Sequence, residues 1–224
     1  MEDSMKKLLA ECIGTFCLVF AGTGAIVING VSGGAIGHAG VALTFGLIVM
    51  AMIHSVGDVS GAHLNPAVTL GFWAARRFPG RGVLPYLGSQ LLGALLASLV
   101  LRGLFPGHET LGATLPAGPV LQTFVLETIL TAMLMFVILS VSHGSREKGL
   151  TAAGAIGGVV ALEAMFAGPI SGASMNPARS FAPALVSGHL EHLWIYFAAP
   201  VLGALLAVQA CRCVREAGCC AAAK

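Results

Sequence analysis

The chain has 224 residues, of which 56% are hydrophobic and only 10% are charged, and its formal net charge at pH 7 is +2. So few polar side chains cannot coat a water-soluble globule, so the composition predicts an integral membrane protein. The small net charge excludes the strongly basic surface that nucleic-acid binding requires, and we expect no nucleic-acid partner.

Six apolar stretches predict six membrane-spanning helices. Most are near the ~20 residues that a helix needs to cross the hydrocarbon core, and the fifth is at the short end. They run over Leu8–Ile28, Ala39–Gly57, Val83–Leu101, Pro119–Val141, Leu150–Phe166 and Leu193–Cys211. The first stretch is expected to remain as a span, because no clear small-residue cleavage site follows it.

The basic residues predict how these spans are oriented. Ten of the twelve fall on one side of a six-span arrangement: Lys6, Lys7, Arg76, Arg77, Arg81, Arg146, Lys148, Arg212, Arg215 and Lys224. By the positive-inside rule this side faces the cytoplasm, so both termini are expected there.

The six cysteines do not predict disulfides. Two lie in the first span and four at the cytoplasmic end: Cys12, Cys17, Cys211, Cys213, Cys219 and Cys220. A disulfide framework would need cysteines in outward loops. We interpret residues 212–224 as an exposed, reduced cytoplasmic tail. The alternative is that its thiolates bind a soft metal or accept lipids.

A nine-residue phrase occurs twice in the chain. Ser60-Gly-Ala-His-Leu-Asn-Pro-Ala-Val68 aligns without gaps on Ser171-Gly-Ala-Ser-Met-Asn-Pro-Ala-Arg179, about half the chain further on. This similarity indicates an internal duplication with halves at about 1–105 and 106–224. Each half would hold three spans, and an odd number of spans inverts the second half relative to the first. We therefore expect one membrane domain over residues 1–224, made of two inverted repeats.

Each copy of the phrase contains a helix start. Asn is a good N-cap and Pro a good first helical residue, so helices are expected over Asn65–Trp73 and Asn176–Val186. Both are too short to cross the membrane. The segments before them, 57–64 and 169–175, are expected to be non-helical, which is tolerated at this depth only inside protein or beside a wet cavity. The two caps should meet from opposite sides near the bilayer midplane.

Two glutamates are expected to support these loops. Glu11 and Glu127 each lie early in the first span of a half, where an ionisable side chain is costly unless it is satisfied. We interpret them as acceptors for backbone amides, Glu11 near His63 and Glu127 near Ser174. A proton relay is the alternative, but no partner His or Lys is evident nearby.

The twin Asn-Pro-Ala segments, together with Ala10-Glu-Cys-Ile-Gly-Thr15 and Asn176-Pro-Ala-Arg-Ser180, resemble the aquaporin or major intrinsic protein family over nearly the whole chain. The stretch from Phe166 to Arg179 is similar to plant nodulin-like intrinsic proteins and their bacterial relatives. The resemblance implies an all-α membrane protein with the aquaporin fold: six transmembrane helices and two re-entrant half-helices in an inverted repeat. It also implies a homotetramer with one pore per protomer, in a lipid bilayer.

The half-helices predict how such a pore would work. Each presents the positive end of its dipole to the midplane, which repels cations and protons. The side-chain amides of Asn65 and Asn176 can donate hydrogen bonds to the oxygen of a passing molecule. Loop carbonyls would replace the hydration of a neutral solute, and the candidates are those of Gly61, Ala62, His63, Gly172, Ala173 and Ser174.

By the resemblance, a selectivity constriction is formed by Phe45, Ala164, Ala173 and Arg179. Strict water channels typically carry His where this chain has Ala164, so the opening should be wider and less polar. Other positions are closer to water channels than to glycerol facilitators, namely Ser180, Ala184, Tyr196 and Phe197. The preferred solute therefore stays open between water, glycerol and metalloid acids.

The sequence thus predicts a passive channel for water and small uncharged solutes, including glycerol and metalloid acids such as arsenite or borate, that excludes protons and ions. The alternatives are a strict water channel and an ion-coupled secondary transporter, although no carboxylate cluster marks the loop tips. No enzyme is expected, because no nucleophile, base and orienting group occur at usable spacing.

Cofactors and metals are not expected, since His54 and His63 lack a second ligand pair. Asp58 is expected at the cytoplasmic mouth, and Glu163 beside either the pore or a contact between protomers. The short loops favour a plasma membrane, with a bacterial inner membrane preferred.

Overall fold

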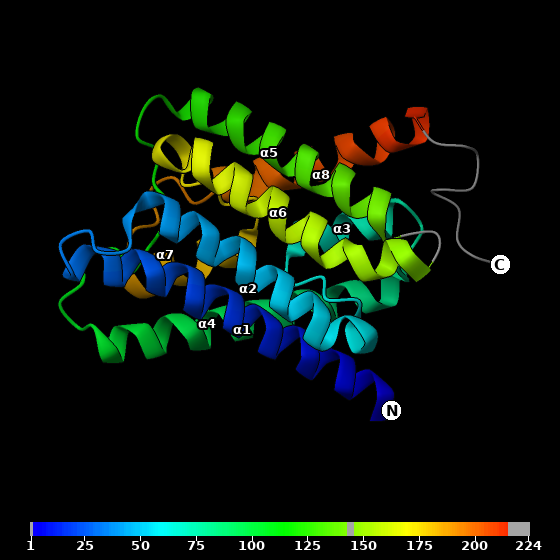
Figure 1. The fold of residues 1–224 in the computed structure, drawn as a ribbon, viewed down its shortest axis with the longest axis horizontal. Coiled ribbons are helices and arrows are strands. Elements are labelled where there is room, and N and C mark those ends of the chain that lie inside the picture. The colour runs from blue at the N-terminus through cyan, green and yellow to red at the C-terminus, as the bar shows by residue number, and fades with distance from the viewer. Residues whose placement is uncertain (1, 143–145, 215–224) are drawn as a thin grey trace.

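Six long helices and two short ones make up the part of the chain that the computed structural model describes, residues 2–142 and 146–214 (Figure 1). The long helices are α1 (Glu2–Val31), α2 (Gly37–Ser60), α4 (Val83–Leu104), α5 (Val120–Val141), α6 (Arg146–Ser171) and α8 (Ile195–Val214). The short ones are α3 (Pro66–Ala74) and α7 (Pro177–Ser187), with a 3-10 turn, η1 (Gly80–Gly82). All six long helices are apolar and long enough to cross a membrane, which confirms the predicted all-α fold.

Two predicted helix ends were wrong. α2 continues to Ser60 and α6 to Ser171, so the non-helical loops cover only residues 61–64 and 172–175. Both helices stop at a left-handed glycine, Gly61 at φ 86° and Gly172 at φ 84°, a conformation that glycine adopts without steric cost. The glycines, and not the apolar run lengths, therefore set where the loops begin.

Pro169 lies inside the last turns of α6 instead of ending the helix. Proline has no N–H, so the carbonyl of Met165 loses its intrahelical donor. His38 of α2 replaces that donor, with its Nε2 2.7 Å from the Met165 oxygen. A contact from another helix thus allows α6 to continue through the proline.

The predicted cytoplasmic tail begins inside a helix. α8 runs to Val214, where Cys211 is buried and Cys213 is exposed. Cys219 and Cys220 lie outside the described residues.

The two halves pack in matching ways. α1 packs on α4 and α2, as α5 packs on α8 and α6, and α2 meets α6 at the centre. The short helices cross between halves, since α3 packs against α8 and α7 against α4. Figure 1 shows α3 and α7 in opposite halves of the molecule, with the first turn of α1 and the last turn of α8 on the α3 side. Each half-helix is therefore positioned by the last span of the other half.

Glycines permit close contacts between helices. A Cβ on Gly93 of α4 would overlap the Cys12 carbonyl of α1, and one on Gly203 of α8 would overlap the Thr128 carbonyl of α5. Gly46 and Gly157 make the same contact between α2 and α6. Small residues let helices approach closely in membranes, and these three contacts are within one chain.

Candidate functional site

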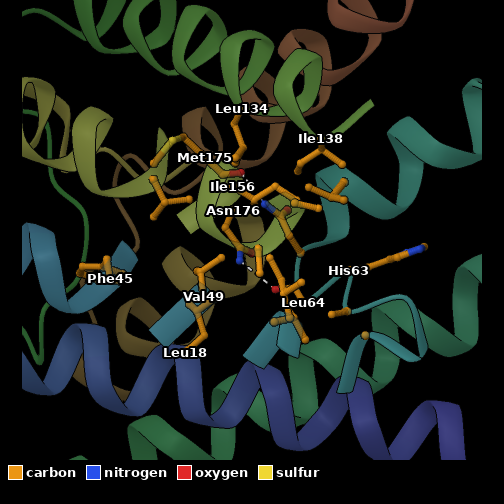
Figure 2. Close-up of a pocket in the computed structure, with 18 of the residues that line it drawn as sticks. Leu18, Phe45, Val49, His63, Leu64, Leu134, Ile138, Ile156, Met175 and Asn176 are labelled. Carbon is orange, nitrogen blue, oxygen red and sulfur yellow. Dashed lines mark hydrogen bonds between the residues drawn. The ribbon is translucent and has the colours of Figure 1, made fainter. Parts of the chain in front are cut away.

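A cavity of about 610 Å³ lies between the two halves. Asn65 and Asn176 line it together with the constriction quartet, by which we mean the four residues predicted to form a constriction, Phe45, Ala164, Ala173 and Arg179. Figure 2 shows Phe45 and His63 at opposite ends of this cavity, with Asn176 between them. Of the predicted pore-carbonyl residues, all but Gly172 line the cavity: Gly61, Ala62, His63, Ala173 and Ser174.

The two asparagines cap their half-helices and bind each other's loops. Asn65 Oδ1 accepts from the Ala67 amide at 2.8 Å, and Asn176 Oδ1 accepts from the Ala178 amide at 3.0 Å. Asn65 Nδ2 donates to the Met175 carbonyl at 2.7 Å. Asn176 Nδ2 donates to the Leu64 carbonyl at 2.9 Å, the dashed line in Figure 2. An amide carries two N–H donors, so each asparagine keeps one for a molecule in the cavity.

Both loops adopt the same unfavourable backbone. Ala62 and Leu64 have φ of 46° and 54°, and Ala173 and Met175 have φ of 39° and 52°. Residues other than glycine rarely adopt this left-handed region, and they keep it only where their surroundings hold it. This backbone places the loop carbonyls beside the cavity. The side chains that hold the backbone in this conformation are therefore part of the site.

Glu11 restrains the first loop. Its carboxylate is fully buried and accepts from the amides of His63 at 2.9 Å and Leu64 at 2.8 Å. It also accepts from Ser60 Oγ at 2.7 Å and Gln90 Nε2 at 2.8 Å. Four donors satisfy a carboxylate that would otherwise be costly inside a membrane.

Glu127 restrains the second loop in the same way. It is fully buried and accepts from the amides of Ser174 and Met175, each at 2.9 Å, and from Ser171 Oγ at 2.7 Å. Tyr196 makes another hydrogen bond to the end of α6, since its hydroxyl donates to the Ser171 carbonyl at 2.7 Å. Tyr86 makes the corresponding bond to the Ser60 carbonyl in the first half.

Arg179 has the least favourable position in the quartet. It lies in the first turn of α7, beside the positive end of the helix dipole, and is only 2% exposed. Its Nη1 donates to the Gly112 carbonyl at 2.7 Å, and its guanidinium carbon lies 5.1 Å from the centre of the Phe45 ring. These contacts hold a cation at the edge of the cavity. The Phe45 ring fits because Gly22 opposite has no side chain to obstruct it.

The opposite end of the cavity is built around His63. Its ring packs against Phe72, Phe78 and Tyr86, with centroid distances of 4.7, 4.8 and 5.1 Å. His54 and Asp58, both exposed, line the mouth beyond it. Within residues 2–142 and 146–214 no three His, Cys, Asp or Glu side chains are grouped to hold a metal ion.

Several supporting residues were missed from the sequence. Gln90, which holds Glu11, could have been found as a polar side chain within an apolar span. Two groups of the α4–α5 connection carry no such signal: the Gly112 carbonyl, and Thr114 Oγ1, which donates to Ser180 Oγ at 2.8 Å. Loop composition does not reveal which groups face a distant helix.

Glu163 occupies neither of its predicted positions. It does not line the cavity, and its side chain is fully buried within the chain, so it is not exposed for a protomer contact. Neither carboxyl oxygen has a hydrogen-bond partner among the described residues.

Six membrane-crossing helices around a cavity, with two asparagine-capped half-helices meeting inside it, define a membrane channel. The family described as "Major intrinsic protein" matches residues 1–210, and the chain belongs to this family. Its members are channels and not enzymes, and this protein is a channel for water and small solutes.

Relatives and a solved structure agree with this assignment. "Aquaporin NIP1-1" of Oryza sativa subsp. japonica is 49% identical over 94% of this chain and 75% of its own length. "Nodulin-26" of Glycine max is 46% identical over 90% of this chain and 74% of its own length. The aquaglyceroporin of Plasmodium falciparum superposes with a TM-score of 0.84 at 26% identity, covering 92% of this chain and 94% of that one.

Proposed function

We propose that the pore passes water together with uncharged solutes up to the size of glycerol, including neutral metalloid acids. The observation that carries this proposal is the constriction quartet: two methyl side chains, Ala164 and Ala173, line the same cavity as Phe45 and Arg179. Alanines leave room for a carbon backbone, Phe45 gives it an apolar wall, and Arg179 offers donors to its hydroxyls. The similarity to an aquaglyceroporin supports the same solute range.

Asn65 and Asn176 act at the middle of the pore in this proposal. Their free N–H groups donate to the oxygen of a passing molecule, and the two helix dipoles place positive potential at the same point. A water held by its oxygen turns its own hydrogens away from both asparagines, which interrupts a chain of proton transfer. Cations are repelled by the same dipoles and by Arg179.

The loop carbonyls and the two buried glutamates complete the mechanism. Carbonyls of Gly61, Ala62, His63, Ala173 and Ser174 accept from the solute hydroxyls that lose water on entry. We propose that the Gly172 carbonyl belongs to the same set. Glu11 and Glu127 act as positioning residues, because they bind the loop amides and leave these carbonyls free. Corresponding roles in residues 1–105 and 106–224 support one domain of two inverted repeats.

Transport is passive in this proposal. An ion-coupled transporter needs a charged binding site that changes occupancy, and the described loop tips carry neutral asparagine amides. A requirement for a proton or sodium gradient during vesicle swelling would contradict the passive mechanism.

The protomer is proposed to work as a homotetramer in a plasma membrane, with both termini in the cytoplasm. The basic residues beside the chain ends support this orientation. The relatives from Oryza sativa and Glycine max are plant proteins, so the preference for a bacterial membrane rests on the short loops alone.

The test compares solutes in reconstituted vesicles. Stopped-flow light scattering is recorded with water, glycerol, urea and arsenite, for the wild type and for Ala164→His. An imidazole at this position narrows the opening, and we expect glycerol permeability to fall at least about tenfold while water permeability falls much less. Ala164→Ser is the matched control, because it adds polarity with little volume. Equal loss of glycerol and water flux would contradict a constriction at Ala164, and a wild type impermeable to glycerol would favour the strict water channel.

A further inference from the structure

The loop between α4 and α5 holds Arg179 through a strained turn. The acceptor for Arg179 Nη1 is the carbonyl of Gly112, at φ 75°, and the residue before it is Leu111 at φ 52°. Leucine rarely adopts a left-handed conformation, so this turn needs restraints of its own. The buried Leu111 side chain, packed near Val27 and Leu101, supplies one of them.

His108 supplies another restraint. The Leu111 amide donates to His108 Nδ1 at 3.1 Å. A backbone N–H can only donate, so Nδ1 carries no proton and the ring proton is on Nε2. Arg102, in the last turn of α4, donates to the His108 carbonyl at 2.9 Å and fixes the backbone that carries the ring. The chain of contacts therefore runs from α4 through His108 and the Leu111–Gly112 turn to Arg179.

Mostly uncharged residues surround the ring of His108. The residue is half-buried and lines a hollow at the surface. The charged groups nearby are Arg102, which bonds to backbone carbonyls and not to the ring, and the exposed Glu109, which lines the same hollow. α1 contributes Gly30 and Val31, which are uncharged.

We propose that His108 is a positioning residue for Arg179, and that protonation of its ring releases the Leu111–Gly112 turn and changes the selectivity of the pore. Imidazole is the side chain that changes charge between about pH 5 and 8. In the protonated ring both nitrogens are donors, so Nδ1 would direct a hydrogen at the Leu111 N–H instead of accepting from it. The inference rests on the proposed role of Arg179, and it assigns control of that residue to a side chain outside the pore.

The effect should be graded, because other contacts hold the same loop. The Ala117 amide donates to the Ile170 carbonyl, and Thr114 Oγ1 donates to Ser180 Oγ at 2.8 Å.

Other histidines should respond differently to protonation. His38 bonds to a carbonyl through Nε2 and keeps that donor when protonated, and the ring of His189 contacts Ser187 Oγ, a hydroxyl that can donate or accept.

The experiment measures the ratio of glycerol to water permeability in proteoliposomes at about pH 7.5 and about pH 5.5, with the same buffer on both sides. For the wild type we expect the ratio to change on the order of two- to tenfold, the population shift that loss of one hydrogen bond allows. His108→Asn keeps an acceptor three residues before the Leu111 amide and does not titrate, so it should match the neutral wild type at both pH values. His108→Lys has donors only and should show the acid ratio at both. His189→Asn is the matched control and should keep the wild-type response.

Three results would overturn the inference: a wild-type ratio that does not change with pH, a His108→Asn variant that responds as the wild type does, or a His108→Lys variant with the neutral ratio at pH 7.5. If glycerol fails to permeate the wild type at pH 7.5, the proposed solute range fails instead. In that case the inference is tested by water permeability alone. The water permeability of the wild type should change between the two pH values, and that of His108→Asn should not. If His108→Lys does not fold, the comparison of the wild type with His108→Asn decides whether the inference holds.

Discussion

The two re-entrant loops have the same backbone but are supported from different places. The first is held inside the helix bundle, where Gln90 of α4 donates to both Glu11 and Thr69 Oγ1, at 2.8 and 3.0 Å. The second has a surface loop at the corresponding point, since Thr114 of the α4–α5 connection donates to Ser180 Oγ, which contacts Ser174 Oγ. The half that carries Arg179 is therefore the half that a surface loop can influence. The first half is supported by buried side chains.

The largest expected effect tests what the halves share. Glu11→Ala and Glu127→Ala each leave two buried or part-buried loop amides without an acceptor, at a cost of about 2–6 kcal/mol of stability. Both variants should unfold at much lower temperature in detergent, by a similar amount, and both should lose water flux. Glu191→Ala, at an exposed loop glutamate, is the control. If one of the two variants kept the wild-type unfolding temperature and water flux, the two loops would not both depend on a buried glutamate.

The next effect tests how the halves differ. Gln90→Leu removes a donor to Glu11 and should cost about 1–3 kcal/mol of stability while leaving the glycerol to water ratio unchanged. Thr114→Val should cost less, about 0.5–1.5 kcal/mol, but should change that ratio because it loosens the loop that holds Arg179. Thermal unfolding and vesicle permeability are measured on the same preparations. If the ratio of glycerol to water permeability changed in Gln90→Leu and not in Thr114→Val, the roles assigned to these two residues would be reversed.

The smallest expected effect is a gain in stability. Glu163 is fully buried with no hydrogen-bond partner among the described residues, whereas the aligned position of the first half is the apolar Met52. Removing a buried polar group without partners should stabilise the protein by about 1–2 kcal/mol, so Glu163→Met should raise the unfolding temperature. Glu163→Gln keeps a polar group and should give little or no gain. If Glu163→Met lost stability while Glu163→Gln did not, a polar group at this position would be stabilised in the native protein, and the prediction would be wrong.

Much of the fold was predictable because its signals are local. Apolar runs of membrane length predicted the six spans, and Asn followed by Pro predicted where α3 and α7 begin, because capping involves only neighbouring residues. The helix ends at Ser60 and Ser171 were less predictable. Gly61 and Gly172 could each have continued the helix, and Pro169 required a donor from α2 to stay within α6.

The sequence by itself therefore determined the membrane class and those residues of the repeated Asn-Pro-Ala segments that line the cavity, because hydrophobic length and a repeated motif are properties of consecutive residues. The tertiary structure decided what holds those residues in place. The exchange of bonds between Asn65 and Met175 and between Asn176 and Leu64, the Gly112 acceptor for Arg179, and the burial of Glu163 all depend on side chains and carbonyls far apart in the chain. Such contacts exist only once the helices have packed, because packing fixes which distant groups come within hydrogen-bond distance.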